Sequence, residues 1–106
     1  MSIEIMGETD PTLQTFADQL VAYAEANPHS EIQLYRHTPY SVRIRVIDPN
    51  FRGKTKSMRH QEVWPTLYEL PEDTLNELSF LILVTPEERD SSMSSREFDD
   101  PIPSTM

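Results

Sequence analysis

The segment FRGKTKSMRH, residues 51–60, concentrates cationic side chains of the kind that bind anions. Seven of the nine Lys and Arg residues lie between residues 36 and 59, where Asp48 is the only acid, although the 106-residue chain has a formal net charge of −9. Lys and Arg bind carboxylates and phosphates through charge-assisted hydrogen bonds. We call six of these residues the basic edge: Arg43, Arg45, Arg52, Lys54, Lys56 and Arg59.

Part of the basic edge falls where a turn containing Gly53 enters a predicted helix. A helix N-terminus already carries partial positive charge, so Lys54, Lys56 and Arg59 are unfavourably placed unless an anion binds there. Alternatively, these side chains point into water or pair with nearby acids such as Asp48 and Glu62. The first interpretation predicts a site for an acidic protein or for nucleic acid.

Arg43 and Arg45 belong to an alternating segment, YSVRIRVID, that is typical of a strand. They share its second face with Ser41 and Ile47, whereas the first face is apolar. An exposed face that mixes arginine with aliphatic residues is typical of an interaction surface. The other interpretation is that the C-terminal tail or a short final helix covers this face.

Catalytic and metal-binding patterns are missing from the sequence. The chain has no cysteine, which excludes disulfides, thiolate ligands and cysteine nucleophiles, and its two glycines form no phosphate-binding loop. His37 and His60 are weak candidates for metal ligands, because His37 lies in a predicted turn and His60 lies on an apolar helix stripe. We expect His60 to be a core histidine that hydrogen-bonds the loop backbone, and we expect no enzyme activity and no metal site.

The elements that position these residues follow from periodicity and from turn chemistry. Asp10 and Pro11 predict the start of a helix that ends near residue 27. Two strands, at residues 31–36 and 40–48, should form an antiparallel hairpin. A second helix should run from Thr55 towards Leu70, perturbed by Pro65, and a short helix then precedes the apolar strand SFLILVT.

This order of elements predicts a single α+β domain of the form αββααβ. The helices between the second and third strands form a crossover, so those strands should be parallel in a three-stranded mixed sheet with helices packed on one face. We expect a flexible N-terminus at residues 1–9, a domain at residues 10–88, and a disordered, acidic tail rich in Ser and Pro at residues 89–106.

The sequence resembles the BolA family over roughly residues 10–88. As in that family, a strand ending in Asp is followed by a Phe and a Gly, and an Arg-His pair then opens a helix. The matching positions are Asp48, Phe51, Gly53, Lys54, Arg59, His60, Val63, Trp64, Leu75, Leu78, Ser79 and Thr85. The resemblance implies a fold like the class II K-homology (KH) domain.

The resemblance also implies a choice of partners. BolA proteins pair with a monothiol glutaredoxin to hold a [2Fe-2S] cluster, and some members bind DNA. In the family pattern a histidine before the last strand is a cluster ligand, whereas this chain has Asn76 there, and its short HTP turn leaves His37 as the only candidate for the second ligand. A carboxamide is a poor ligand for iron, so we expect no cofactor bound by the chain itself.

Three functional hypotheses remain open. The first is a small, non-enzymatic interaction module that uses the basic edge to bind an acidic protein partner or nucleic acid. The others are an iron–sulfur accessory protein that pairs with a monothiol glutaredoxin, and a dimerising structural protein. Because the sequence has no secretory signal pattern and no apolar run near the ~20 residues that span a bilayer, we expect a cytoplasmic monomer or weak dimer without membrane contact.

Overall fold

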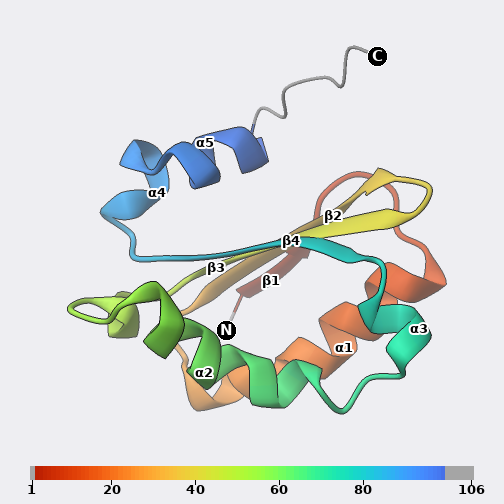
Figure 1. The fold of residues 1–106 in the computed structure, drawn as a ribbon, viewed down its shortest axis with the longest axis horizontal. Coiled ribbons are helices and arrows are strands. Elements are labelled where there is room, and N and C mark those ends of the chain that lie inside the picture. The colour runs from red at the N-terminus through yellow and green to blue at the C-terminus, as the bar shows by residue number, and fades with distance from the viewer. Residues whose placement is uncertain (1, 100–106) are drawn as a thin grey trace.

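The computed structural model describes residues 2–99, which form a sheet with helices on both of its faces (Figure 1). Within this range no helix is long and apolar enough to cross a bilayer. The elements are β1 (Ser2–Ile5), α1 (Pro11–Ala26), β2 (Glu31–Thr38), β3 (Ser41–Ile47), the 3-10 helix η1 (Pro49–Phe51), α2 (Lys56–Leu67), α3 (Glu72–Leu75), β4 (Leu78–Val84), α4 (Glu88–Ser91) and α5 (Met93–Asp99).

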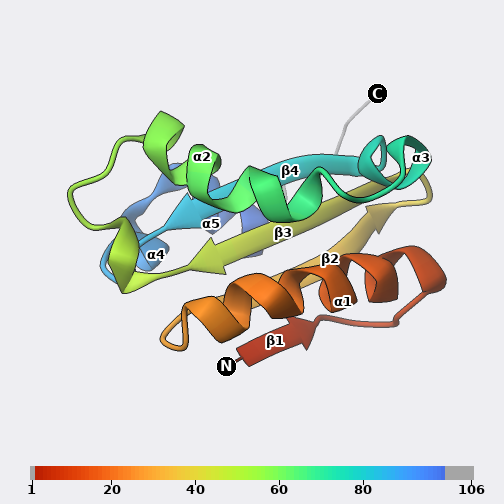
Figure 2. The same ribbon diagram turned by 90° about the horizontal axis from the view of Figure 1, so that it is seen from below.

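The strands lie in the order β1-β2-β3-β4, so β4 is at one edge of the sheet (Figure 2). β2 and β3 are antiparallel, which confirms the predicted hairpin. β3 and β4 are parallel, as the helical crossover between them requires. The predicted α+β class with a mixed sheet is therefore confirmed.

The helix starts follow the predicted capping chemistry. The Asp10 carboxylate accepts a hydrogen bond from the Leu13 backbone N–H at 3.0 Å, which satisfies one of the free N–H groups of the first turn of α1. Thr55 caps α2 in the same way through the Met58 N–H at 3.2 Å. Pro65 lies inside α2.

The main core fills the space between the sheet and the two long helices, α1 and α2, which cover the same face (Figure 1). Val42, Ile44 and Val46 of β3 all point into it, as their alternation predicts. Phe51 of η1 is fully buried in the same core. The loop that follows β3 is therefore anchored by one aromatic side chain.

The prediction of a three-stranded sheet is wrong, because the sheet has a fourth strand, β1. Where the sequence predicts a flexible segment at residues 1–9, Ser2–Ile5 pair in parallel with residues 31–34 of β2. The side chains of Ile3 and Ile5 pack against the main core. Four residues give too short an alternation to identify a strand, and the pairing that stabilises it is with residues far along the chain.

The prediction that helices pack on one face only is also wrong, because α4 and α5 lie on the opposite face from α1 and α2 (Figure 1). Where the sequence predicts a disordered tail at residues 89–106, the chain is helical as far as Asp99; residues 100–106 lie outside the described range. Phe98 of α5 is only 1% exposed and packs with Ile47, Ile82 and Val84 in a second, smaller core. Two apolar residues, Met93 and Phe98, among serines and charged residues do not reveal this packing in the sequence.

Candidate functional site

The basic edge is not one free cationic surface in the structure. Arg43 and Arg45 lie beneath α5, and the other four residues lie around η1 and the start of α2. Five of the six cations form ion pairs with acids, and Lys56 is the one with no ion pair among residues 2–99. The six residues therefore do not form the predicted anion site as a group.

Arg45 is fully buried and has a structural role. Its guanidinium donates hydrogen bonds to Gln33, to the Ser95 backbone carbonyl at 3.2 Å and to the Ser95 hydroxyl at 2.9 Å, and it pairs with Asp99 at 2.8 Å. It also lies 4.6 Å from the centre of the Phe98 ring. A buried charge requires such partners, and four of these contacts are with α5. The interpretation in which a final helix covers this face is confirmed.

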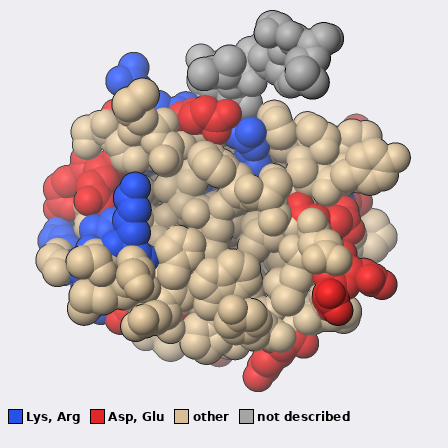
Figure 3. Space-filling view, viewed as in Figure 1, with Lys and Arg blue, Asp and Glu red and all other residues tan. Residues whose placement is uncertain are grey.

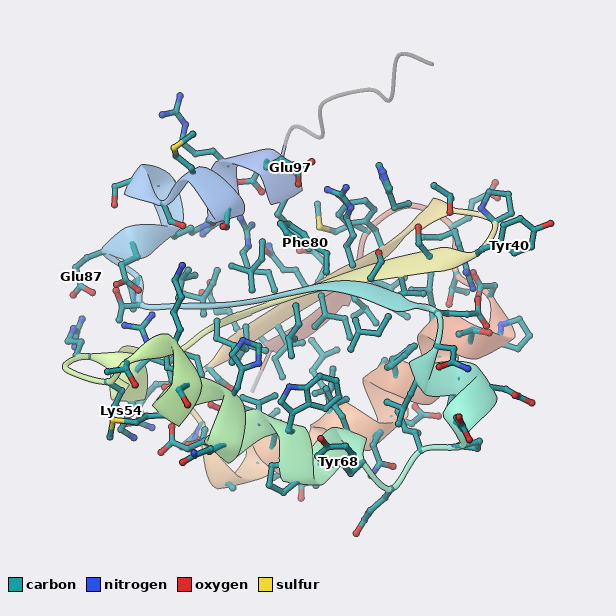
Figure 4. The ribbon with its side chains drawn as sticks, viewed as in Figure 1. Tyr40, Lys54, Tyr68, Phe80, Glu87 and Glu97 are labelled. Atoms are coloured by element: carbon teal, nitrogen blue, oxygen red, sulfur yellow. The ribbon has the colours of Figure 1, made fainter. Side chains whose placement is uncertain are left out.

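Arg43 is mostly buried against the same helix. It pairs with Glu97 at 2.5 Å, lies 3.2 Å from the His37 ring nitrogen Nε2 and stacks on Phe80 at 4.8 Å from the ring centre. Figure 4 shows Phe80 on the side of the sheet that faces α5, where Glu97 also lies. The Nε of Arg43 is buried but has no hydrogen-bond partner.

Arg59 connects three elements. Its guanidinium donates to the backbone carbonyls of Lys54 and Leu83, both at 3.0 Å, and to the Glu88 carboxylate at 2.6 Å. The hydrogen bonds from Arg59 and from the Thr85 backbone hold the pKa of Glu88 below its ordinary value of 4.5. Arg59 therefore fastens α2 to the end of β4 and to α4.

Arg52 and Lys54 are each neutralised by an acid, and Lys54 lies at the end of the molecule where Glu87 also lies (Figure 4). Arg52 pairs with Glu87, and this hydrogen bond lowers the pKa of Glu87 from 4.5 to about 2. Lys54 pairs with Glu62 at 2.5 Å, which confirms the alternative in which nearby acids compensate the cations. Asp48, the other nearby acid, forms no ion pair with the six residues of the basic edge.

Asp48 instead accepts hydrogen bonds inside the protein, where it is fully buried. The Tyr23 hydroxyl donates to its Oδ2 at 2.7 Å, and the Asn50 backbone N–H donates to its Oδ1 at 2.9 Å. Burial, together with the hydrogen bond to this carboxylate, raises the pKa of Tyr23. Asp48 thereby holds η1 against α1.

A groove of about 300 Å³ runs beside β4, between α2 and the C-terminal helices. Figure 3 looks onto this side of the molecule; uncharged residues form the centre of the face, and basic and acidic side chains lie next to one another at one end of it. Its lining includes Lys56, Arg59, His60, Leu81 and Leu83. The sequence identified SFLILVT as a buried strand, but it does not show that this strand lies at an edge.

Some backbone groups of β4 point outward along this groove, away from β3. The Val84 carbonyl accepts from the Asp48 N–H at 2.9 Å and so points towards β3. Because successive residues of a strand direct their backbone groups to alternate sides, the N–H and C=O groups of Leu81 and Leu83 point outward. The outward direction of the Leu83 carbonyl is confirmed by its hydrogen bond from Arg59.

Two polar side chains of α2 line the groove with these backbone groups. Lys56 is exposed, and its ammonium has no ion pair within the described chain. His60 accepts a hydrogen bond at Nδ1 from the Trp64 ring N–H at 3.1 Å, so the ring proton of neutral His60 resides on Nε2. The predicted contact between His60 and the loop backbone is wrong, because this bond lies within α2.

The positions expected to bind a cluster do not fit that chemistry. Asn76 is exposed at the end of α3, and its carboxamide supplies no suitable ligand atom for iron. The Nε2 of His37 contacts Arg43 on the face that α5 covers. Among residues 2–99 no three His, Cys, Asp or Glu side chains are grouped so that they could hold a metal ion.

The resemblance to the BolA family rests on the residues given above and stays a prediction. No family model matches the chain, and neither a curated protein nor a solved structure matches it.

Proposed function

We propose that this protein is a non-enzymatic binding module that takes an extended, acidic segment of a partner protein along β4. The observation that carries the proposal is the groove beside this edge strand, in which Leu81 and Leu83 direct free backbone N–H groups outward. An extended peptide satisfies such groups by adding a strand to the sheet, which is a common mode of peptide recognition. The α2 and α4–α5 walls define where the added segment lies.

Charge complementarity favours an acidic segment. Lys56 and the Nε2 of His60 are uncommitted donors on the α2 side of the groove, whereas the Arg59 guanidinium is bound to Glu88 and Leu83. Lys56 lies at the α2 N-terminus and has no acidic partner among residues 2–99. A carboxylate of the bound segment would supply that partner. Specificity would come from this contact and affinity from the backbone pairing.

Nucleic acid is the less favoured ligand. Binding to a phosphate backbone depends on many free cations, whereas five of the six residues of the basic edge are neutralised by acids. The net charge of −9 adds long-range repulsion. A protein segment needs only one or two cations in addition to the strand edge.

The test uses a random decapeptide phage library selected on the immobilised full-length protein. Selected peptides are then synthesised with a fluorescent label, and their affinity is measured by fluorescence polarisation. We expect enrichment of peptides that combine β-branched residues with Asp or Glu, and a loss of affinity of about tenfold in Lys56→Glu, about 1.4 kcal/mol. Arg96→Glu is the matched control, because Arg96 is exposed on α5, outside the groove lining, and the change in net charge is the same.

Two results would overturn the proposal. One is the absence of enriched acidic peptides, and the other is equal loss of affinity in Lys56→Glu and Arg96→Glu, which would indicate a net-charge effect. A single-stranded oligonucleotide measured in parallel distinguishes the nucleic-acid hypothesis. Its binding would weaken steeply with added salt, and this slope would decrease in Lys56→Glu.

A further inference from the structure

We propose that the sheet face beneath α5 is a second binding surface, for a partner segment that carries acidic and aromatic side chains, and that α5 occupies it as an internal ligand. This surface lies under α5 and is distinct from the Lys56 side of the β4 groove, although Phe80, Ile82 and Val84 border both. It rests on Arg43, Arg45 and the small second core, and on how α5 fills them.

The surface combines two arginines with an apolar floor. Arg43 and Arg45 lie on the same side of β3, and the side chains of Ile82 and Val84 from β4 lie beside them. Phe80 stacks on Arg43. Arginine and aromatic residues are enriched at protein interfaces. Burying an arginine charge beside aliphatic residues costs desolvation free energy, and a face that serves only for packing does not require this charge.

α5 presents the complementary chemistry in three consecutive residues. Glu97 pairs with Arg43, Phe98 enters the apolar floor and contacts the Arg45 guanidinium, and Asp99 pairs with Arg45. The helix has seven residues, too few for stability by itself. Its folding therefore depends on docking, so release of α5 requires loss of these contacts together with the hydrogen bonds from Arg45 to Ser95 and from the Tyr35 hydroxyl to the Phe98 carbonyl.

The fit between α5 and the arginines is incomplete. The buried Nε of Arg43 has no hydrogen-bond partner, which leaves a donor desolvated without compensation. The Asp99 side chain, which pairs with the fully buried Arg45, is 44% exposed and so accessible to water and salt. A carboxylate that approaches Arg43 in a bidentate geometry satisfies both Nε and Nη, which α5 does not achieve.

Competition with α5 sets the apparent affinity of such a partner. When α5 leaves the site open for only a fraction of the time, the apparent dissociation constant of the partner equals the intrinsic constant divided by that fraction. Variants that weaken the docking of α5 should therefore bind an external acidic segment more tightly. The same variants leave Arg43 and Arg45 in place to receive it.

The probe is a fluorescein-labelled peptide with the sequence of residues 88–99, added to the full-length protein and measured by fluorescence polarisation. We expect Phe98→Ala to bind this peptide at least tenfold more tightly than the wild type, because the peptide supplies the missing Phe. Adding Arg43→Gln to Phe98→Ala should abolish this gain, and adding Arg96→Gln should preserve it, since Arg96 is exposed. Lys56→Glu should leave peptide binding unchanged, which separates this site from the groove.

Glu97→Gln provides a second test that creates no cavity, in case Phe98→Ala unfolds the domain. It removes the ion pair with Arg43 and should raise peptide affinity by a smaller factor. Equal peptide affinities in the wild type, Phe98→Ala and Glu97→Gln would overturn the proposal. So would a gain in affinity that persists in the Arg43→Gln background.

Discussion

The Arg59 guanidinium and the Glu88 carboxylate meet at 2.6 Å, and the pair joins two helices that approach the end of β4 from different sides. The Arg59 side chain is 9% exposed and that of Glu88 is 42% exposed, so water screens the acid more than the base. Arg59 also donates to two backbone carbonyls, from Lys54 and Leu83. These contacts make Arg59 an organising residue of the fold rather than a free site for an external anion.

Arg59→Gln should lower the free energy of unfolding by about 2 to 4 kcal/mol, because it removes the charged donor of two backbone carbonyls and leaves the Glu88 carboxylate with only the Thr85 backbone N–H as a donor. Urea unfolding followed by circular dichroism measures the change. Arg52→Gln is the control, since Arg52 pairs with Glu87 at the exposed surface and should have almost no effect. Similar losses in both variants would contradict the structural role of Arg59.

Glu88 should make stability depend on pH in the acidic range. Its pKa is lower in the folded protein than the ordinary 4.5, so the unfolded chain binds more protons in that range. The stabilisation is fully present above the unfolded pKa and is lost as the pH falls through the folded pKa. Below about pH 4.5, the free energy of unfolding should therefore fall less steeply in Glu88→Gln than in the wild type.

Urea unfolding at several pH values tests this prediction. Glu25→Gln removes the same charge from an exposed position of α1, so it controls for the change in net charge. An unchanged slope in Glu88→Gln would show that the Arg59 contact does not favour the ionised carboxylate.

Tyr23→Phe should lower the free energy of unfolding by about 1 to 3 kcal/mol, because it removes a hydrogen bond to the fully buried Asp48 carboxylate. The loss arises from a desolvated oxygen rather than from lost packing, since the ring remains. Thermal and urea unfolding measure it. Tyr40→Phe makes the same chemical change at a side chain that is 84% exposed and should be neutral; equal effects would show that Asp48 finds another donor.

The parts of the fold that the sequence predicts are those specified by neighbouring residues. Asp10 and Pro11 define the start of α1 through local capping, and the alternation of Val42, Ile44 and Val46 orients β3. β1 and α5 are not specified locally. β1 depends on pairing with β2, and α5 depends on Phe98 meeting a core from distant strands, so neither leaves a long periodic pattern.

The candidate site was predictable only in its residue types. The sequence identifies Arg59 as unusual at a helix start, but its acid, Glu88, lies 29 residues further along the chain, in the segment that begins the helices after β4. Likewise, the composition of SFLILVT indicates burial, whereas its position at the sheet edge follows from the strand order. The pattern of residues along the chain does not show which distant charges or strands pair with one another.

The direction of the β4 backbone groups gives a prediction that needs no partner. Proline lacks a backbone N–H. At position 82 this N–H points to β3, so a proline there removes a hydrogen bond of the sheet. At position 81 the N–H points into the groove, so a proline there removes no hydrogen bond between the strands. Relative to Ile82→Ala, Ile82→Pro should be less stable by about 1 to 3 kcal/mol, whereas Leu81→Pro should be close to Leu81→Ala. The alanine variants remove the side chain in both comparisons, so only the backbone effect remains. If the larger penalty falls at position 81, β4 presents the opposite set of N–H groups to the groove and the proposed strand addition fails.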